Sequence, residues 1–212
     1  MKTQAQISAI IEELKQLYPD ALCSLEYQKD YELLFSVRLA AQCTDARVNL
    51  VTPALFERFP TLEAFAAATP DEVGEYVRSC GFWRAKAKDI VGSAQMLLRG
   101  FGGKVPDNMD DLLRLPGVGR KTANLILGDV YGKEGYVCDT HCIRITGRLG
   151  ITDGSKDPLK VEQQLRKTIP PEESSDFCHR MVLHGRALCM ARGPKCEECP
   201  LKTLCDYGTN PQ

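Results

Sequence analysis

Apolar residues recur at three- and four-residue spacing along most of the chain, and this period predicts helices. In residues 5–19 the apolar face consists of Ile7, Ile10, Ile11, Leu14 and Leu17. Residues 30–41 are apolar around most of their circumference, which indicates a central, buried helix. Further helices are predicted at about 45–59, 62–67, 71–79, 84–98, 109–113, 120–131, 139–149, 158–168 and 173–190.

The pattern of half-buried strands, alternating apolar and polar residues, is scarce, so we expect an all-α fold. The composition changes near residues 132–135, which suggests a helical unit over residues 22–133 and a second, C-terminal unit. The N-terminal helix fits either unit. No stretch approaches the roughly 18 apolar residues of a membrane span, and no secretory signal is visible. The formal net charge of −1 means that any nucleic-acid surface must be local.

The stretch Leu115–Ala123 reads Leu-Pro-Gly-Val-Gly-Arg-Lys-Thr-Ala, and an apolar helical run follows it directly. A Gly-x-Gly turn adopts positive φ angles easily and can direct its N–H groups toward an anion. The next helix adds the positive end of its dipole. The predicted phosphate-binding residues are Gly117, Val118, Gly119 and Arg120. Lys121 stands on the first helical turn, where a cation is normally disfavoured, and this placement suggests a function.

Four of the ten cysteines are packed into the tail, at Cys189, Cys196, Cys199 and Cys205. In a reducing compartment such a set is more often a metal or cluster site than a disulfide framework. Four thiolates suit zinc and an iron–sulfur cluster alike. Zinc sites more often show two Cys-x-x-Cys pairs, so the single pair here favours a [4Fe–4S] cluster. Arg192 and Lys195 lie between the first two cysteines, either resting on a phosphate backbone or forming an ordinary solvated loop.

Three further positions allow two interpretations each. Asp139 stands at a helix start, where it can cap the helix, and it can also face Lys121 and transfer a proton or stabilise positive charge. Gln42 ends the buried helix and is either a reader of a base edge or an ordinary exposed amide. Phe82 and Trp83 form an aromatic turn that either wedges between bases or anchors the core.

These motifs run in the same order as in the endonuclease III family, which the chain resembles from about Gln42 to Cys205. Members of that family are bifunctional DNA glycosylases and abasic-site lyases of the helix-hairpin-helix superfamily. The resemblance implies a six-helix barrel domain over residues 22–133, with the helix-hairpin-helix at about 109–131. It also implies an iron–sulfur domain made of residues 1–21 and 134–212, whose cluster loop spans residues 189–205 and holds a [4Fe–4S] cofactor.

The resemblance further implies that Lys121 is the nucleophile and Asp139 the essential carboxylate. Gln42 and Phe82 fall where family members fill the gap left by an extruded nucleotide, although many members carry an aliphatic residue at the second position. The implied activity is base excision repair of double-stranded DNA: removal of damaged bases, in this family oxidised pyrimidines, and Schiff-base β-elimination at the abasic site. We expect a monomer that acts in the cytoplasm at the nucleoid, without a membrane.

Other kinds of protein remain open at this point, and one of them, a small iron–sulfur electron carrier, leaves the hairpin unexplained. A monofunctional glycosylase of the same superfamily typically lacks the lysine that this chain has at position 121. A helix-hairpin-helix module that only binds DNA needs neither Lys121 opposite Asp139 nor a cluster.

Overall fold

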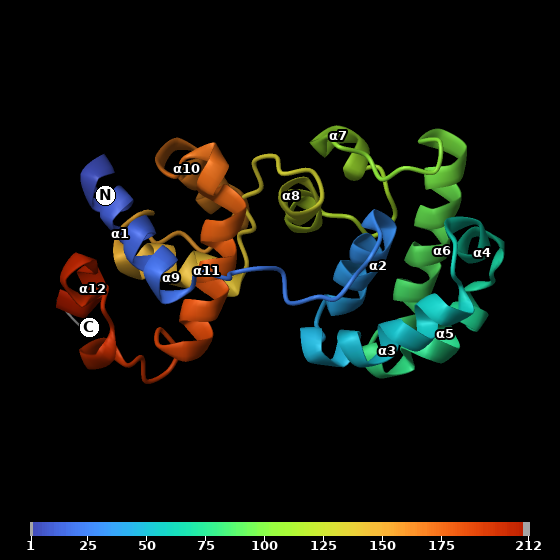
Figure 1. Cartoon of the computed structure of the whole chain (residues 1–212), viewed down its shortest axis with the longest axis horizontal. Coiled ribbons are helices and arrows are strands. Elements are labelled where there is room, and N and C mark those ends of the chain that lie inside the picture. The colour runs from blue at the N-terminus through green and yellow to red at the C-terminus, as the bar shows by residue number, and fades with distance from the viewer. Residues whose placement is uncertain (1, 210–212) are drawn as a thin grey trace. The chain divides into compact units, whose positions relative to one another are not determined.

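The computed structural model describes residues 2–209, and all of the regular secondary structure in that part of the chain is helical (Figure 1). The α-helices are α1 (Gln4–Leu17), α2 (Asp30–Ala40), α3 (Asp45–Arg58), α4 (Leu62–Ala67), α5 (Pro70–Val77), α6 (Trp83–Gly100), α7 (Met109–Leu112), α8 (Arg120–Asp129), α9 (Thr140–Leu149), α10 (Pro158–Thr168), α11 (Ser174–Ala187) and α12 (Asp206–Thr209). Short 3₁₀-helices are η1 (Arg78–Cys80), η2 (Pro171–Glu173), η3 (Cys196–Glu198) and η4 (Lys202–Leu204). The expected all-α fold is confirmed.

The hydrophobic pattern located the longer helices, and local polar residues explain where several of them begin. The hydroxyl groups of Thr44, Thr61 and Thr69 accept N–H groups at the starts of α3, α4 and α5, as N-caps do. The pattern missed α12 and the four 3₁₀-helices, which are too short to show a period. It also extended α11 too far, because Leu188 and Cys189 both donate to the carbonyl of His184 and end the helix.

Contacts between residues divide the described chain into two compact units. Residues 23–131 form one of them, which contains α2–α8 and is called the hairpin unit below. Residues 2–22 and 132–209 form the other, which contains α1 and α9–α12 and is called the cysteine unit. Each unit has a hydrophobic core of its own. No helix within residues 2–209 is both long and apolar enough to cross a membrane.

The core of the hairpin unit is built around α2, which packs against α3, α6 and α8 (Figure 1). The predicted burial of this helix is confirmed, since Leu33, Leu34 and Phe35 are at most 1% exposed. Phe65 from α4 brings a second aromatic ring to the same core, with its centroid 5.0 Å from that of Phe35. Close aromatic packing of this kind stabilises the core beyond the area that it buries.

In the cysteine unit, α9 packs against α11 and α12, and the N-terminal helix α1 packs against α11. Ile10 and Leu14 of α1 are completely buried, so the apolar stripe predicted from the sequence faces this core. The segment before α9 has no regular secondary structure, and the Tyr136 hydroxyl donates to the carbonyl of Ile169 at 2.9 Å. That bond fixes the segment that leads to Asp139.

The hairpin turn (residues 113–119) joins α7 to α8 within the hairpin unit. At Gly117 the backbone has φ 72°, a conformation in which only glycine avoids strain. A Cβ at Gly117 would lie 2.5 Å from Nε of Arg38 and 2.6 Å from Oδ2 of Asp89. These two groups are bonded to each other at 2.7 Å, and the Ser93 hydroxyl donates to the Pro116 carbonyl at 3.1 Å. The turn is therefore held against side chains of α2 and α6.

We predict that Gly117→Ala lowers the free energy of unfolding by roughly 2–4 kcal/mol, because a left-handed alanine is strained and its methyl group meets the Arg38–Asp89 pair. Gly119→Ala is the matched control in the same turn. Its φ is −104° and a Cβ there meets no atom within 4 Å, so only the exchange of a glycine N-cap for alanine acts, and the expected loss is smaller, about 0.5–1 kcal/mol. Urea unfolding of both variants measures the difference, and equal values would contradict the packing described here.

Candidate functional site

The hairpin turn presents backbone groups at the start of α8. Gly119 is the N-cap residue of α8 and has no side chain with which to cap the first turn. Gly117, Gly119 and Arg120 are exposed, and Val118 is half-buried. Exposed N–H groups at a helix N-terminus form a favourable site for an anion such as phosphate.

Lys121 lies on the first turn of α8, next to this anion-binding geometry. It is exposed, so burial within this chain does not remove its ammonium group from water. A bound macromolecule that covers the turn would supply that desolvation. The exposure also leaves the Lys121 amine accessible as a nucleophile.

Asp139 is the N-cap of α9, and its Oδ1 accepts the N–H of Cys142 at 2.7 Å. The capping interpretation is therefore confirmed. The bond also holds the half-exposed carboxylate in one orientation. Nearby, Nδ1 of His141 lies 3.1 Å from Nη2 of Arg144.

Gln42 and Phe82 both lie in turns where the backbone is left-handed, with φ 55° and 46°. For residues other than glycine this conformation costs about 1–3 kcal/mol and is concentrated at functional sites. Both residues are exposed, and Phe82 has 71% of its surface accessible. The alternative of an aromatic core anchor is therefore wrong for Phe82. Trp83 is half-buried, and its ring packs against α5, where it would lie 2.4 Å from a Cβ placed at Gly74.

Lys86 is a structural residue of these two turns that sequence analysis missed. It is only 1% exposed, and its ammonium donates to the carbonyl of Leu39 at 2.8 Å and to that of Cys80 at 2.6 Å. The first carbonyl precedes the Gln42 turn and the second precedes the Phe82 turn. Burial lowers the pKa of Lys86, because the fold removes its charge from water. A lysine on a helix is ordinarily exposed, so the residue type gave no reason to predict that Lys86 is buried.

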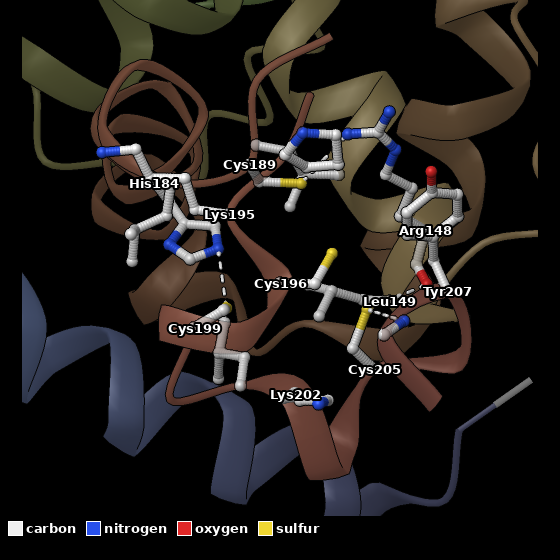
Figure 2. Close-up of a pocket in the computed structure, with 15 residues that line it drawn as sticks. Arg148, Leu149, His184, Cys189, Lys195, Cys196, Cys199, Lys202, Cys205 and Tyr207 are labelled. Carbon is white, nitrogen blue, oxygen red and sulfur yellow. Dashed lines mark hydrogen bonds between the residues drawn. The ribbon is translucent and has the colours of Figure 1, made fainter. Parts of the chain in front are cut away.

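The four cysteines of the tail line one pocket in the cysteine unit, as Figure 2 shows. Cys189 follows α11, Cys196 begins η3, and Cys199 and Cys205 follow the two short 3₁₀-helices. Within residues 2–209, no three His, Cys, Asp or Glu side chains are arranged as ligands of a single metal ion. The structure thus brings the four predicted cysteines near one another around a shared space.

Hydrogen-bond donors lie beside two of the four sulfur atoms of this pocket. Nη1 of Arg148 donates to Sγ of Cys189 at 3.3 Å, and the Gly208 N–H donates to Sγ of Cys205 at 3.3 Å. Burial raises the pKa of the Cys199 and Cys205 thiols, and the neighbouring cysteines raise it further. A bound cationic centre would reverse that effect and hold the sulfurs as thiolates. The donor set therefore fits an anionic metal–thiolate group.

The two cations of the loop between Cys189 and Cys196 differ in their surroundings. Arg192 is exposed, whereas the ammonium of Lys195 lies 4.0 Å from a carboxylate oxygen of Glu198. Lys195 therefore lies in an exposed, charged loop, as the solvated-loop interpretation expects, and has a carboxylate nearby. A polyanion that docks on this loop would replace a weak surface ion pair, which contributes little to stability.

Comparison with known proteins gives consistent matches over the chain. Residues 35–171 match the family described as HhH-GPD superfamily base excision DNA repair protein. The chain is 48% identical to an endonuclease III of Synechocystis sp., over 91% of this chain and 88% of that protein. It is 39% identical to an endonuclease III of Bacillus subtilis, over 96% of this chain and 93% of that protein. A solved structure of a trapped endonuclease III–DNA covalent intermediate matches with a TM-score of 0.92 and 42% identity, covering 99% of this chain and 98% of that chain.

Proposed function

Because the chain belongs to the endonuclease III family of the HhH-GPD superfamily, we propose that it excises damaged bases from double-stranded DNA and cleaves the resulting abasic sites. Oxidised pyrimidines are the proposed lesions, as in the family that the sequence resembles. The observation that carries the catalytic assignment is the exposed Lys121 directly after the Gly-Val-Gly turn. A lysine in that place has a backbone anion site beside it and remains free to react.

The proposed DNA contacts lie on the hairpin unit and on the loop over residues 189–205, called the cysteine loop below. A damaged base inside a duplex is out of reach, so its nucleotide must leave the stack. The hairpin turn binds backbone phosphates near the extruded nucleotide, with Arg192 and Lys195 as further phosphate contacts. Gln42 and Phe82 enter the gap that remains, and their exposure and left-handed backbone support this role.

Lys121 is the proposed nucleophile. Its free amine attacks C1′ of the sugar, a C–N bond forms, and the bond to the damaged base breaks. Ring opening then gives a Schiff base, which acidifies the proton on C2′ and permits β-elimination of the 3′ phosphate. Covering by DNA removes the exposed side chain of Lys121 from water, beside the positive end of the α8 dipole.

Asp139 is the proposed carboxylate of the reaction. It transfers protons and stabilises the positive charge that develops on the sugar. The bond between its Oδ1 and the N–H of Cys142 supports this assignment, since it holds the carboxylate in a fixed orientation. Capping and catalysis are compatible because a carboxylate has two oxygens with several acceptor positions.

Cys189, Cys196, Cys199 and Cys205 are the proposed ligands of a [4Fe–4S] cluster. When bound, that group links the turns of the loop that carries Arg192 and Lys195. Support comes from the four thiols on one pocket and from the donors to sulfur, since hydrogen bonds to cysteine sulfur are a regular feature of such sites. Arg148 also donates to the carbonyl of Met190 at 2.7 Å, so it orients the first turn of the loop.

We predict that Lys121→Ala abolishes the covalent enzyme–DNA adduct that borohydride traps on duplexes with an abasic site, because the amine that forms the Schiff base is gone. Lys104→Ala is the matched control, since it removes another exposed lysine of the same unit outside the hairpin turn. Gel electrophoresis separates the adduct from free DNA. Trapping at the wild-type yield in the Lys121 variant would overturn the assignment, and its absence from the wild type would favour a module that only binds DNA.

Substitution of Asp139 separates its two roles. Asp139→Asn retains an oxygen for the Cys142 N–H, so we expect unchanged stability within about 0.5 kcal/mol and a turnover lower by roughly two powers of ten. Asp139→Ala also loses the cap and lowers the free energy of unfolding by about 1 kcal/mol. Single-turnover excision of thymine glycol and urea unfolding give the two quantities. Wild-type turnover of the Asn variant would reduce Asp139 to a cap.

The cluster assignment has a compositional test. We expect the purified protein to contain iron and acid-labile sulfide in equal amounts, and Cys196→Ser to lower both because one thiolate ligand is lost. Cys23→Ser is the control, since Cys23 belongs to the hairpin unit and lies outside the pocket. Metal analysis of the three proteins decides the matter: a full complement of zinc without sulfide would contradict the proposal.

A further inference from the structure

One imidazole ring in the cysteine unit has a hydrogen-bond partner at each of its nitrogens. His184 lies on α11, is only 2% exposed, and belongs to the pocket that the four tail cysteines line. Its Nε2 lies 3.6 Å from Sγ of Cys199, a contact drawn as a dashed line in Figure 2. Its Nδ1 lies 3.1 Å from the hydroxyl oxygen of Tyr18. The imidazole thus connects a proposed cluster ligand to the end of the N-terminal helix.

Tyr18 is held against α11 by its backbone as well as by its ring. It directly follows α1, and its N–H donates to the carbonyl of Leu14. Its own carbonyl accepts Nε of Arg180 at 3.3 Å, and Arg180 stands about one helical turn before His184 on α11. The rings of Tyr18 and His184 meet edge to face, with their centroids 5.9 Å apart. These contacts place the Tyr18 hydroxyl at Nδ1 of the imidazole.

The chemistry of the two neighbours decides which ring nitrogen carries the hydrogen. A neutral imidazole has one donor and one acceptor nitrogen. A thiolate that binds a metal has no proton to donate, so the nitrogen that faces Cys199 must be the donor. Nε2 of His184 then carries the hydrogen, and the lone pair of Nδ1 accepts the Tyr18 hydroxyl. A free thiol allows the opposite assignment as well, because thiols and phenols can each donate or accept.

We propose that Tyr18 and His184 are positioning residues of the metal centre: the Tyr18 hydroxyl fixes the tautomer of His184, and the Nε2–H of His184 donates to the Cys199 thiolate. This inference rests on the proposed assignment of Cys199 as a cluster ligand. Two of the other ligand sulfurs have N–H donors beside them, so His184 supplies a donor for a third. A residue that follows α1 thereby supports a loop near the other end of the chain.

Two measurable properties of the metal centre depend on this donor. A hydrogen bond to a ligand sulfur draws negative charge away from the iron, which favours the reduced state and raises the reduction potential. It also holds the thiolate in place, and partners of this kind typically change metal affinity by about 10–100-fold. Because His184 is buried, bulk water does not compete for the bond. Loss of the donor should therefore lower the reduction potential and speed the release of iron.

The experiment compares the metal-containing wild type with Tyr18→Phe, His184→Leu and His184→Gln. Loss of visible absorbance in excess chelator gives the rate of iron release, and voltammetry gives the reduction potential. We expect iron release about tenfold faster in His184→Leu, a smaller acceleration in Tyr18→Phe, and a lower potential in both. His184→Gln should lie nearer to the wild type than His184→Leu does, because its amide N–H can replace Nε2–H. A Tyr18→Phe variant that matches the wild type in both quantities would overturn the inference.

A matched control separates the loss of this donor from general loosening of the cysteine unit. Tyr136→Phe also removes a hydroxyl group that donates within the same unit, but Tyr136 does not line the pocket. Its rate of iron release and its reduction potential should equal those of the wild type. Changes as large as those in Tyr18→Phe would assign the effect to the stability of the unit and contradict the proposal.

Iron analysis of the wild type distinguishes a failure of this inference from a failure of the proposed function. A wild type without iron and sulfide refutes the cluster assignment itself. A normal iron content together with unchanged variants refutes only the roles of Tyr18 and His184. Tyr18→Phe keeps both rings in place, so it tests the hydrogen bonds even where His184→Leu loses its metal during purification.

Discussion

One buried ammonium connects the parts of the hairpin unit on which the proposed DNA contacts depend. Lys86 donates to the carbonyls of Leu39 and Cys80, at the end of α2 and the end of η1. A buried charge is tolerated only when such bonds replace its hydration. The two segments must therefore stay where the ammonium needs them. The hydrogen bonds of Lys86 therefore also fix the positions of the turns that follow, which carry Gln42 and Phe82.

The same helix also supports the hairpin turn. Arg38 of α2 pairs with Asp89 of α6, and Gly117 packs directly against that pair. The apolar residues of α2 bury the helix, while its last turn provides both the Arg38 side chain and the Leu39 carbonyl. A hydrophobic core thus fixes polar groups at one end of α2, and these groups position the hairpin turn and the turns that carry Gln42 and Phe82. Without these hydrogen-bond partners, burial of the polar groups would cost several kcal/mol.

In the cysteine unit, α9 has an equivalent double role. Asp139 caps its first turn, and Arg148 near its other end donates to the Cys189 sulfur and to the Met190 carbonyl. Under the proposed function, one rigid helix therefore carries the reactive carboxylate and the residue that orients the cysteine loop. A metal–thiolate group in that loop would stabilise the end of α9 opposite to Asp139. This arrangement accounts for a structural role of the cysteines without assigning them any step of the reaction.

The sequence by itself determined the features that depend on neighbours along the chain. Helical period, N-caps such as Thr69 and Asp139, the hairpin glycines and the spacing of the tail cysteines are all local, so residue order predicted them. Tertiary structure alone decided the burial of Lys86 and the exposure of Phe82. Those properties arise when segments distant in the chain meet, since the cost of burying a charge or exposing a ring is set by the atoms that surround it.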